Sequence, residues 1–215
     1  MSVSEDRTVQ PSPTSPVPAS GIADPGPLGL AAFALTTFLL SASNARWMSH
    51  STGAAFLGYA LAYGGLGQLL AGMWEFRNRN VFGATAFSSY GGFWIGLYFW
   101  FIVIASKAPA AAAGAVNKDV GWILVSFAIF NLYMLILSTQ LSLAIFLVFL
   151  TLEATEIIDA IGKFHQGLAA YTGILQVGGY VGIVTAAVAW YASAAGVSNG
   201  IAGRLRFPLG KPLIS

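Results

Sequence analysis

Hydrophobic residues fall along this chain in six long runs that short polar segments separate. The runs cover about residues 28–45, 54–74, 81–104, 120–138, 141–159 and 168–195. A helix needs about 20 residues, at 1.5 Å each, to cross a hydrocarbon core of about 30 Å. The pattern therefore predicts an all-α, polytopic membrane protein whose six transmembrane helices form one bundle at 24–195. Residues 1–23, rich in Pro, Ser and Thr, are predicted to be a disordered tail, and 196–215 a C-terminal tail.

The third run combines a lack of ionisable acids and bases with several hydroxyl groups. From residue 81 to residue 106 it contains no Asp, Glu, Lys, Arg or His, but its first half carries Thr85, Ser88, Ser89 and Tyr90. Lipid offers these hydroxyls no hydrogen-bond partner, so they are expected to face other protein or a water-filled path. Two interpretations stay open: a polar path for a solute, or polar contacts between packed helices.

Small residues in two other runs predict close contacts between helices. In the second run they recur every four positions at Ala54, Gly58 and Ala62, and in the last run at Gly178 and Gly182. Such spacing places small side chains on one helix face and lets a neighbouring backbone approach. Gln68 is the polar exception of the second run and is interpreted as an interhelical hydrogen-bonding group.

The fifth run breaks the hydrophobic pattern. Its purely apolar part, 141–152, is too short to cross a bilayer, so Glu153 is expected at membrane depth or in a wet vestibule. Glu153, Glu156 and Asp159 follow at intervals of three and can line one side of a helix. An ionisable group inside a membrane suggests a function. The alternative is that the helix leaves the bilayer early and the acids are solvated, which suits Asp159 best. Asn131, in the middle of the fourth run, also needs a protein or water partner.

Composition agrees with a membrane protein and excludes several functional classes. The 215 residues are 56% hydrophobic and 8% charged, with a mean hydropathy of +0.72, whereas about a quarter of the residues are charged in soluble domains. There is no cysteine, and His50 and His165, interpreted as loop residues, form no metal motif. A net charge of +2 without a basic run argues against a nucleic-acid partner. No nucleophile–base arrangement lies within the runs, so we expect neither an enzyme nor a cofactor.

Six spans place both termini on the same side of the membrane. On that side lie six Lys and Arg residues: Arg7, Arg77, Arg79, Arg204, Arg206 and Lys211. The other side carries four: Arg46, Lys107, Lys118 and Lys163. The excess of positive charge predicts cytoplasmic termini.

Two motifs carry a resemblance to a known family. Residues 24–30 read Asp-Pro-Gly-Pro-Leu-Gly-Leu, and residues 82–94 read Phe-Gly-Ala-Thr-Ala-Phe-Ser-Ser-Tyr-Gly-Gly-Phe-Trp. They resemble the acetate uptake transporter family, also called the Gpr1/Fun34/YaaH family. That family opens its first span with Asn-Pro-x-Pro-Leu-Gly-Leu and its third with Phe-Gly-x-Thr-Ala-Phe-x-Ser-Tyr-Gly-x-Phe-Trp. Asp24 replaces the family's Asn; it keeps a cap or near-cap for the first helix but adds negative charge.

The resemblance implies a fold, an assembly and a function. It implies six helices per subunit, a homo-hexameric ring in a plasma membrane, and passage of acetate and related small monocarboxylates through each subunit. An apolar constriction in this family corresponds here to Phe33 of the first span, Tyr90 of the third and Leu152 of the fifth. Glu153, Glu156 and Asp159 are departures, since mostly apolar or hydroxyl residues are expected there.

These residues suggest a transport hypothesis. Acetate titrates near the value of a Glu side chain, about 4.3, so it is anionic at neutral pH and needs a path with polar groups. The candidates for binding the carboxylate are Asp24, Thr36, Thr85, Ser88, Ser89 and Asn131. Glu153 or Glu156 could carry a proton with the anion, because burial favours the neutral form of a carboxyl group. The alternatives are a passive anion channel of the same architecture and a membrane sensor or scaffold that does not transport.

Overall fold

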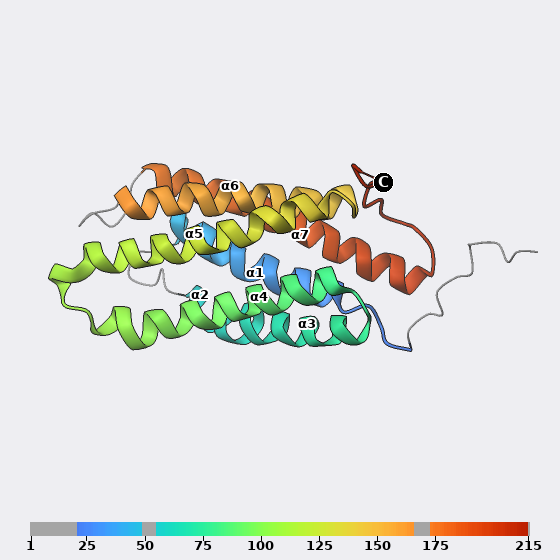
Figure 1. Cartoon of the computed structure of the whole chain (residues 1–215), viewed down its shortest axis with the longest axis horizontal. Helices are drawn as coiled ribbons and strands as arrows, with labels where there is room; N and C mark the ends of the chain where they lie inside the picture. Colours follow the sequence, from blue (N-terminus) through green and yellow to red (C-terminus); the bar gives the residue numbers. More distant parts are fainter. Residues whose placement is uncertain (1–20, 49–54, 166–172, 215) are drawn as a thin grey trace, which may run out of the picture.

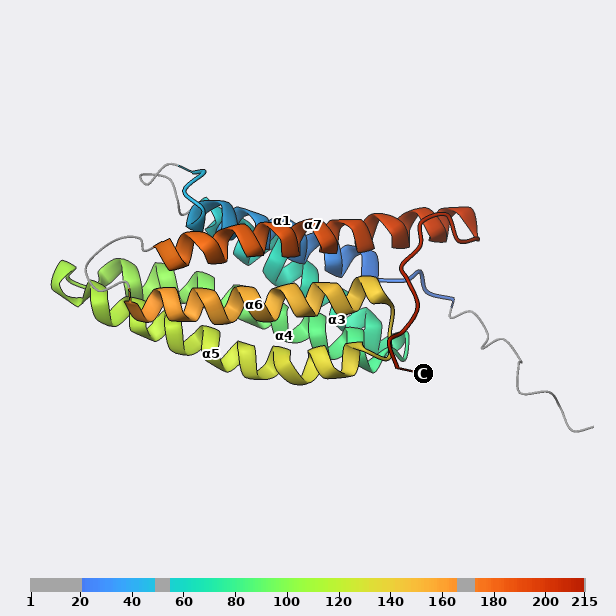
Figure 2. The same cartoon turned by 90° about the horizontal axis from the view of Figure 1, so that it is seen from above.

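The computed structural model describes residues 21–48, 55–165 and 173–214, and this part of the chain is helical and free of strands. Its helices lie side by side along the long axis of the molecule (Figures 1 and 2). The predicted all-α bundle is confirmed. In chain order the helices are α1 (Gly26–Asn44), α2 (Phe56–Tyr59), η1 (Ala60–Gly67), α3 (Gln68–Arg77), α4 (Val81–Phe99), η2 (Trp100–Ile104), η3 (Ala105–Lys107), η4 (Ala110–Ala112), α5 (Ala113–Ser138), α6 (Leu143–His165) and α7 (Gly173–Ala202).

These elements make six passes along the bundle within the described residues. Four of the helical stretches are long and apolar enough to cross a membrane: Gly26–Asn44, Val81–Lys107, Ala110–Ser138 and Gly173–Ala202. The other two passes are the segment 56–77, which is built from three consecutive elements, and α6, which carries four charged residues. Large apolar side chains such as Trp122, Ile129 and Ile136 are exposed on the outside of α5. The chain is a multi-pass membrane protein.

Some predicted boundaries are wrong, for physical reasons that the structure makes clear. Helix α5 begins at Ala113, not near residue 120, because the preceding segment is rich in alanine and favours a helix. Helix α6 continues through the acids to His165, so Lys163 and His165 belong to a helix rather than to loops. Helix α7 extends to Ala202. His50 and residues 1–20 of the predicted tail lie outside the described part of the chain.

Glycines bring the helix backbones close together. The predicted close contacts of α7 are confirmed, because a Cβ at Gly178 would overlap Asp159 of α6 and a Cβ at Gly182 would overlap Ser41 of α1. Of the predicted small face of the second pass, Gly58 and Ala62 are exposed and do not pack inside the subunit, and Ala54 lies outside the described residues. In that pass the close contact is made instead by Gly65 in η1, a π-helix, and by Gly72 in α3; a Cβ at Gly72 would meet the backbone N of Ser88 at 2.7 Å.

Two short connections fix the end of the bundle at which α1 and α4 begin. Asp24 Oδ1 accepts a hydrogen bond from Gly26 N (2.9 Å), which confirms its predicted role next to the cap of α1. Between α3 and α4, Arg79 adopts a left-handed conformation (φ 62°), and Asn80 Oδ1 then accepts from Gly83 N (3.0 Å) to cap α4. The described chain begins and ends at this same end of the bundle (Figures 1 and 2).

The C-terminal segment after α7 folds back across the turn between α5 and α6. The Leu209 carbonyl accepts a hydrogen bond from Ala144 N (2.8 Å), and the Thr139 carbonyl accepts from Leu213 N (2.9 Å). This segment therefore forms part of the end of the bundle that holds the cavity described next.

Candidate functional site

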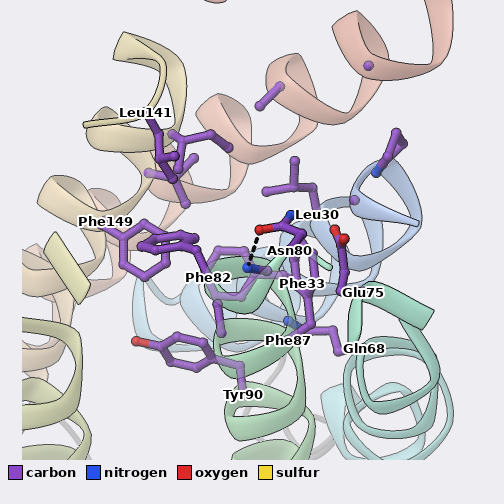
Figure 3. A pocket seen from close by; sticks show the side chains of 18 of the residues that line it. Leu30, Phe33, Gln68, Glu75, Asn80, Phe82, Phe87, Tyr90, Leu141 and Phe149 are labelled. Carbon is purple, nitrogen blue, oxygen red and sulfur yellow. Dashed lines mark hydrogen bonds between the residues drawn. The ribbon is translucent and has the colours of Figure 1, made fainter. Parts of the chain in front are cut away.

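A cavity of about 230 Å³ lies in the bundle, at the end where α1 and α4 begin. Its wall is mostly apolar and includes Leu30, Phe82, Phe87, Leu141 and Phe149 (Figure 3). Leu209, from the C-terminal segment, adds to the same wall. Its polar side chains come from the bundle end and the inner side of α3: Asp24, Gln68, Glu75 and Asn80. We call this space the entry cavity.

The three residues that the sequence assigns to a constriction all line the entry cavity. Phe33, Tyr90 and Leu152 come from three helices and are 5%, 4% and 5% exposed. The rings of Phe33 and Tyr90 meet edge to face, with centroids 5.8 Å apart. Figure 3 shows Tyr90 at the far side of the cavity from Glu75 and Asn80. The structure thus brings the three residues to the wall of one cavity, and their role as a constriction stays a prediction.

A hydrogen-bond network holds the Tyr90 side chain in place. The Tyr90 hydroxyl donates to Asn131 Oδ1 (2.8 Å). Asn131 Nδ2 in turn donates to Glu153 Oε2 (2.7 Å) and to the Phe149 carbonyl (3.0 Å). Asn131 is fully buried. The polar partners that the sequence predicts for Asn131 are therefore Tyr90 of α4 and Glu153 of α6.

The acids of α6 lie inside the bundle. Glu153 is half-buried, whereas Glu156 and Asp159 are 4% and 5% exposed. The Glu156 carboxyl group lies beside the Tyr90 side chain, and its Oε2 has no hydrogen-bond partner among the described residues. Asp159 Oδ2 accepts a hydrogen bond from Asn44 Nδ2 on α1 (3.0 Å). The alternative that Asp159 is solvated is wrong, because this carboxyl group is buried and α1 supplies it with a buried donor.

The mouth of the entry cavity has polar groups whose place the sequence analysis missed. Glu75 is 1% exposed, and its Oε2 accepts a weak hydrogen bond from Asn78 Nδ2 (3.4 Å). Gly83 leaves space for this carboxyl group, since a Cβ there would lie 2.8 Å from Glu75 Oε1. Gln68, predicted to bond another helix, has an Oε1 without a partner in the described structure and lines the cavity. The sequence contained one signal for the position of Glu75, because this residue is a single acid directly after an apolar run.

Four of the predicted carboxylate-binding hydroxyls lie outside the lining of the entry cavity. Thr36 is fully buried, donates to the Ala32 carbonyl (3.0 Å) and packs against Gly64. Ser88 packs against Gly72 of α3. Thr85 and Ser89 are half-buried. Of the six predicted binding residues, Asp24 lines the cavity, and Asn131 reaches it through Tyr90.

Metal-ligating residues do not cluster in the described part of the chain: it holds no group of three or more His, Asp or Glu residues that could bind a metal ion. The groups that line the entry cavity are its apolar side chains, the rings of Phe33 and Tyr90, and the carboxyl and amide groups of Asp24, Gln68, Glu75 and Asn80.

Comparison with known proteins gives a consistent result. Residues 6–208 match the model of the GPR1/FUN34/yaaH family. Acetate permease A of Emericella nidulans is 38% identical over 200 residues, which are 88% of this chain and 66% of that protein. Accumulation of dyads protein 2 of Saccharomyces cerevisiae is 39% identical over 189 residues, 86% of this chain and 65% of that protein. The chain thus spans slightly less than two thirds of these fungal relatives.

Bacterial relatives are covered almost completely. The succinate-acetate/proton symporter SatP of Escherichia coli is 31% identical over 191 residues, 88% of this chain and 96% of that protein. The solved structure of the bacterial acetate channel SatP superposes with a TM-score of 0.78 at 30% identity, over 88% of this chain and 99% of that one. The family resemblance inferred from the two motifs is confirmed.

Proposed function

Because the chain belongs to the GPR1/FUN34/yaaH family, we propose that it carries acetate and related small monocarboxylates across a membrane. The names of an acetate permease, a succinate-acetate/proton symporter and an acetate channel among its relatives support this substrate class. The observation in the molecule that carries the proposal is the mostly apolar cavity whose lining includes Phe33, Tyr90 and Leu152. These relatives point to a carrier or channel rather than an enzyme.

The dimensions and chemistry of the site suit a small carboxylate. The wall and the aromatic ring accept a methyl group, and the narrow apolar passage disfavours larger or strongly hydrated solutes. Gln68 and Asn80 line the cavity, and a side-chain amide group can donate hydrogen bonds to a carboxylate. Asp24 and Glu75 add negative charge at the mouth, which opposes anion entry unless a proton or a cation accompanies the substrate.

That negative charge favours proton coupling as the mode of transport. We assign the proton to Glu153 or Glu156, because both lie at the constriction: Glu153 through Asn131, and Glu156 beside Tyr90. The rival mode is a passive anion channel of the same architecture, which the name of the solved relative favours. A sensor or scaffold that does not transport is the third possibility, and it predicts no flux.

The setting of this activity is part of the same proposal. We propose that the subunits assemble as a homo-hexamer in the plasma membrane, with one path in each subunit and both termini in the cytoplasm. The end of the bundle that carries both described chain ends also carries Arg77, Arg79, Arg204 and Arg206. Such an excess of positive charge favours the cytoplasmic side.

Substrate size tests the role of the constriction. Replacing Leu152 with alanine removes a buried side chain from the ring, so butyrate and longer monocarboxylates should pass faster relative to acetate. Leu150, exposed on the same helix, is the matched control, and Leu150→Ala should keep the ratio of the parent protein. The rates are measured with labelled acids in proteoliposomes. An unchanged ratio in Leu152→Ala would remove this residue from the size filter.

Proton coupling is tested at Glu153. Glu153→Gln keeps the shape and a hydrogen-bonding group but cannot exchange a proton at neutral pH, so stimulation of acetate uptake by an inward proton gradient should disappear. Asp119→Asn, at an exposed acid of α5, should leave the stimulation intact. If Glu153→Gln responds to the gradient like the parent protein, the test moves to Glu156→Gln. If both respond normally, these acids do not carry the proton.

A further inference from the structure

A second cavity of about 30 Å³ lies on the other side of the constriction. Helices α1, α4 and α6 contribute to both cavities, and their lining residues follow in order: Leu30, then Leu40 on α1; Tyr90, then Phe93 on α4. On α6 the entry cavity ends at Leu152 and the second cavity begins seven residues later. Seven helical residues correspond to about 10 Å. The two cavities are therefore successive spaces along one axis, and we call the second one the far cavity.

Three polar side chains face the far cavity from two helices: Asn44, Asp159 and Lys163. Asp159 accepts the hydrogen bond from Asn44 through Oδ2, while its buried Oδ1 has no hydrogen-bond partner among the described residues. The absence of a side chain at Gly178 on α7 leaves room for this oxygen, because a Cβ at that position would overlap it. Asp159 is thus a buried carboxyl group that is only half satisfied.

Lys163 brings the opposite charge to the same space. It is half-buried on α6, one turn beyond Asp159, and the two groups are close enough to interact electrostatically. Asp159 is the acid whose charge acts on Lys163. A partly buried ammonium group depends on such a partner, because it is costly when it is left without an anion. The arrangement leaves room for an additional carboxylate beside this ammonium group.

We propose that Asn44, Asp159 and Lys163 form a second carboxylate-binding station, at which the ammonium group of Lys163 exchanges between Asp159 and the carboxylate of the travelling acid. The inference rests on the proposed transport of carboxylates and adds a site with its own residues. The cavity has room for about two water molecules, which is close to the size of a carboxylate group. Phe93 and Leu97 line its apolar side and can face the methyl group.

In this station Lys163 attracts the anion, and Asp159 helps to release it. Lys163 alone would hold an anion tightly and slow its release, whereas conduction needs sites that bind weakly enough to empty. When the acid leaves, Asp159 restores a partner to the ammonium group. The exchange breaks no covalent bond and needs no further reactant, since one carboxylate replaces another.

The station predicts a one-sided kinetic effect. Acetate uptake is measured in right-side-out and in inverted membrane vesicles, with orientation checked by protease access to a C-terminal tag. Lys163→Gln should raise the half-saturating acetate concentration about tenfold from the face opposite the chain termini, and change it little from the other face. Lys163→Arg keeps the positive charge, so its half-saturating acetate concentration should stay close to that of the parent protein. Lys118→Gln, an exposed lysine of α5 at the same end, is the control and should match the parent protein.

Asp159→Asn tests the exchange itself. Without the internal anion, acetate should bind Lys163 more tightly, so the half-saturating concentration should fall several-fold from the same face while the maximal rate also falls. A rise in the half-saturating concentration, or equal changes from both faces in Lys163→Gln, would overturn the station. Size-exclusion profiles of the purified variants identify any loss of folding, and Asp159→Ser provides a second variant at that position.

Equilibrium binding separates this inference from the proposed function. Binding of ¹⁴C-acetate to purified protein in detergent should weaken in Lys163→Gln and persist in Lys118→Gln. If the parent protein binds acetate with this dependence on Lys163 but moves none across vesicles, the proposed transport fails and the station stands. If transport is normal and binding is identical in both variants, the station is wrong and the proposed function stands. If the parent protein neither binds nor moves acetate, both are wrong.

Discussion

Replacing Asn131 tests the network that holds the constriction tyrosine. Asn131→Leu keeps the side-chain volume but removes the bonds to Tyr90, Glu153 and Phe149. An interhelical hydrogen bond in a membrane protein contributes about 0.6–2 kcal/mol, and a buried polar group left unpaired costs about 1–3 kcal/mol. We therefore expect Asn131→Leu to lower the free energy of unfolding by about 2–4 kcal/mol. Tyr90→Phe, which removes one bond, should lower it by about 1 kcal/mol.

The double variant shows whether the two residues interact directly. Because the bond between Tyr90 and Asn131 is lost in either single variant, the double variant should be about 1 kcal/mol more stable than the sum of the two effects predicts. The assay is reversible unfolding in mixed micelles of mild detergent and sodium dodecyl sulfate, followed by far-UV circular dichroism. Additivity within about 0.3 kcal/mol would refute the reasoning, since it would mean that the hydroxyl and the amide stabilise the fold independently.

Two further predictions concern the helix contacts around the cavity. Gly91→Ala should destabilise the fold by about 1–3 kcal/mol in the same assay, because the new Cβ would lie 2.7 Å from Leu69 N and 2.9 Å from the Gly65 carbonyl. Gly92→Ala, where nothing lies within 4 Å, should be neutral or slightly stabilising, and an equal loss in both variants would contradict the contact. Asn80→Ala removes the cap of α4 and should cost about 1 kcal/mol; an unchanged unfolding free energy would show that water replaces the cap.

The bundle could be predicted because membrane spans are long and their signal is local. Hydrophobic runs predicted the passes, and the family resemblance pointed to Phe33, Tyr90 and Leu152, which line one cavity. Helix ends were less predictable in alanine-rich segments. Helix α5, for example, begins at Ala113, before Lys118, in a segment that was expected to be a loop. In the second pass, Gly64 and Gly65 of η1 are buried against other helices, whereas Gly58 of α2 is exposed.

The polar contacts of the site could not be predicted from spacing along one helix. Asn44 and Asp159 are 115 residues apart and meet only because α1 and α6 pack together. Sequence alone therefore left open whether Asp159 was solvated. Likewise, the hydroxyl of Ser88 was expected near a path, but its position on α4 directs it to Gly72 of α3. Leu209, assigned to a tail, reaches the entry cavity because the chain folds back after α7.

The most direct test of the proposed transport is uptake of ¹⁴C-acetate into liposomes that contain the purified protein, with and without an inward proton gradient. Uptake well above that of protein-free liposomes, stimulated by the gradient, is the predicted result. Uptake that responds to voltage and ignores the proton gradient would replace coupled transport with a channel. Uptake equal to that of protein-free liposomes under both driving forces would contradict the assignment of the cavity and its constriction as a path for acetate.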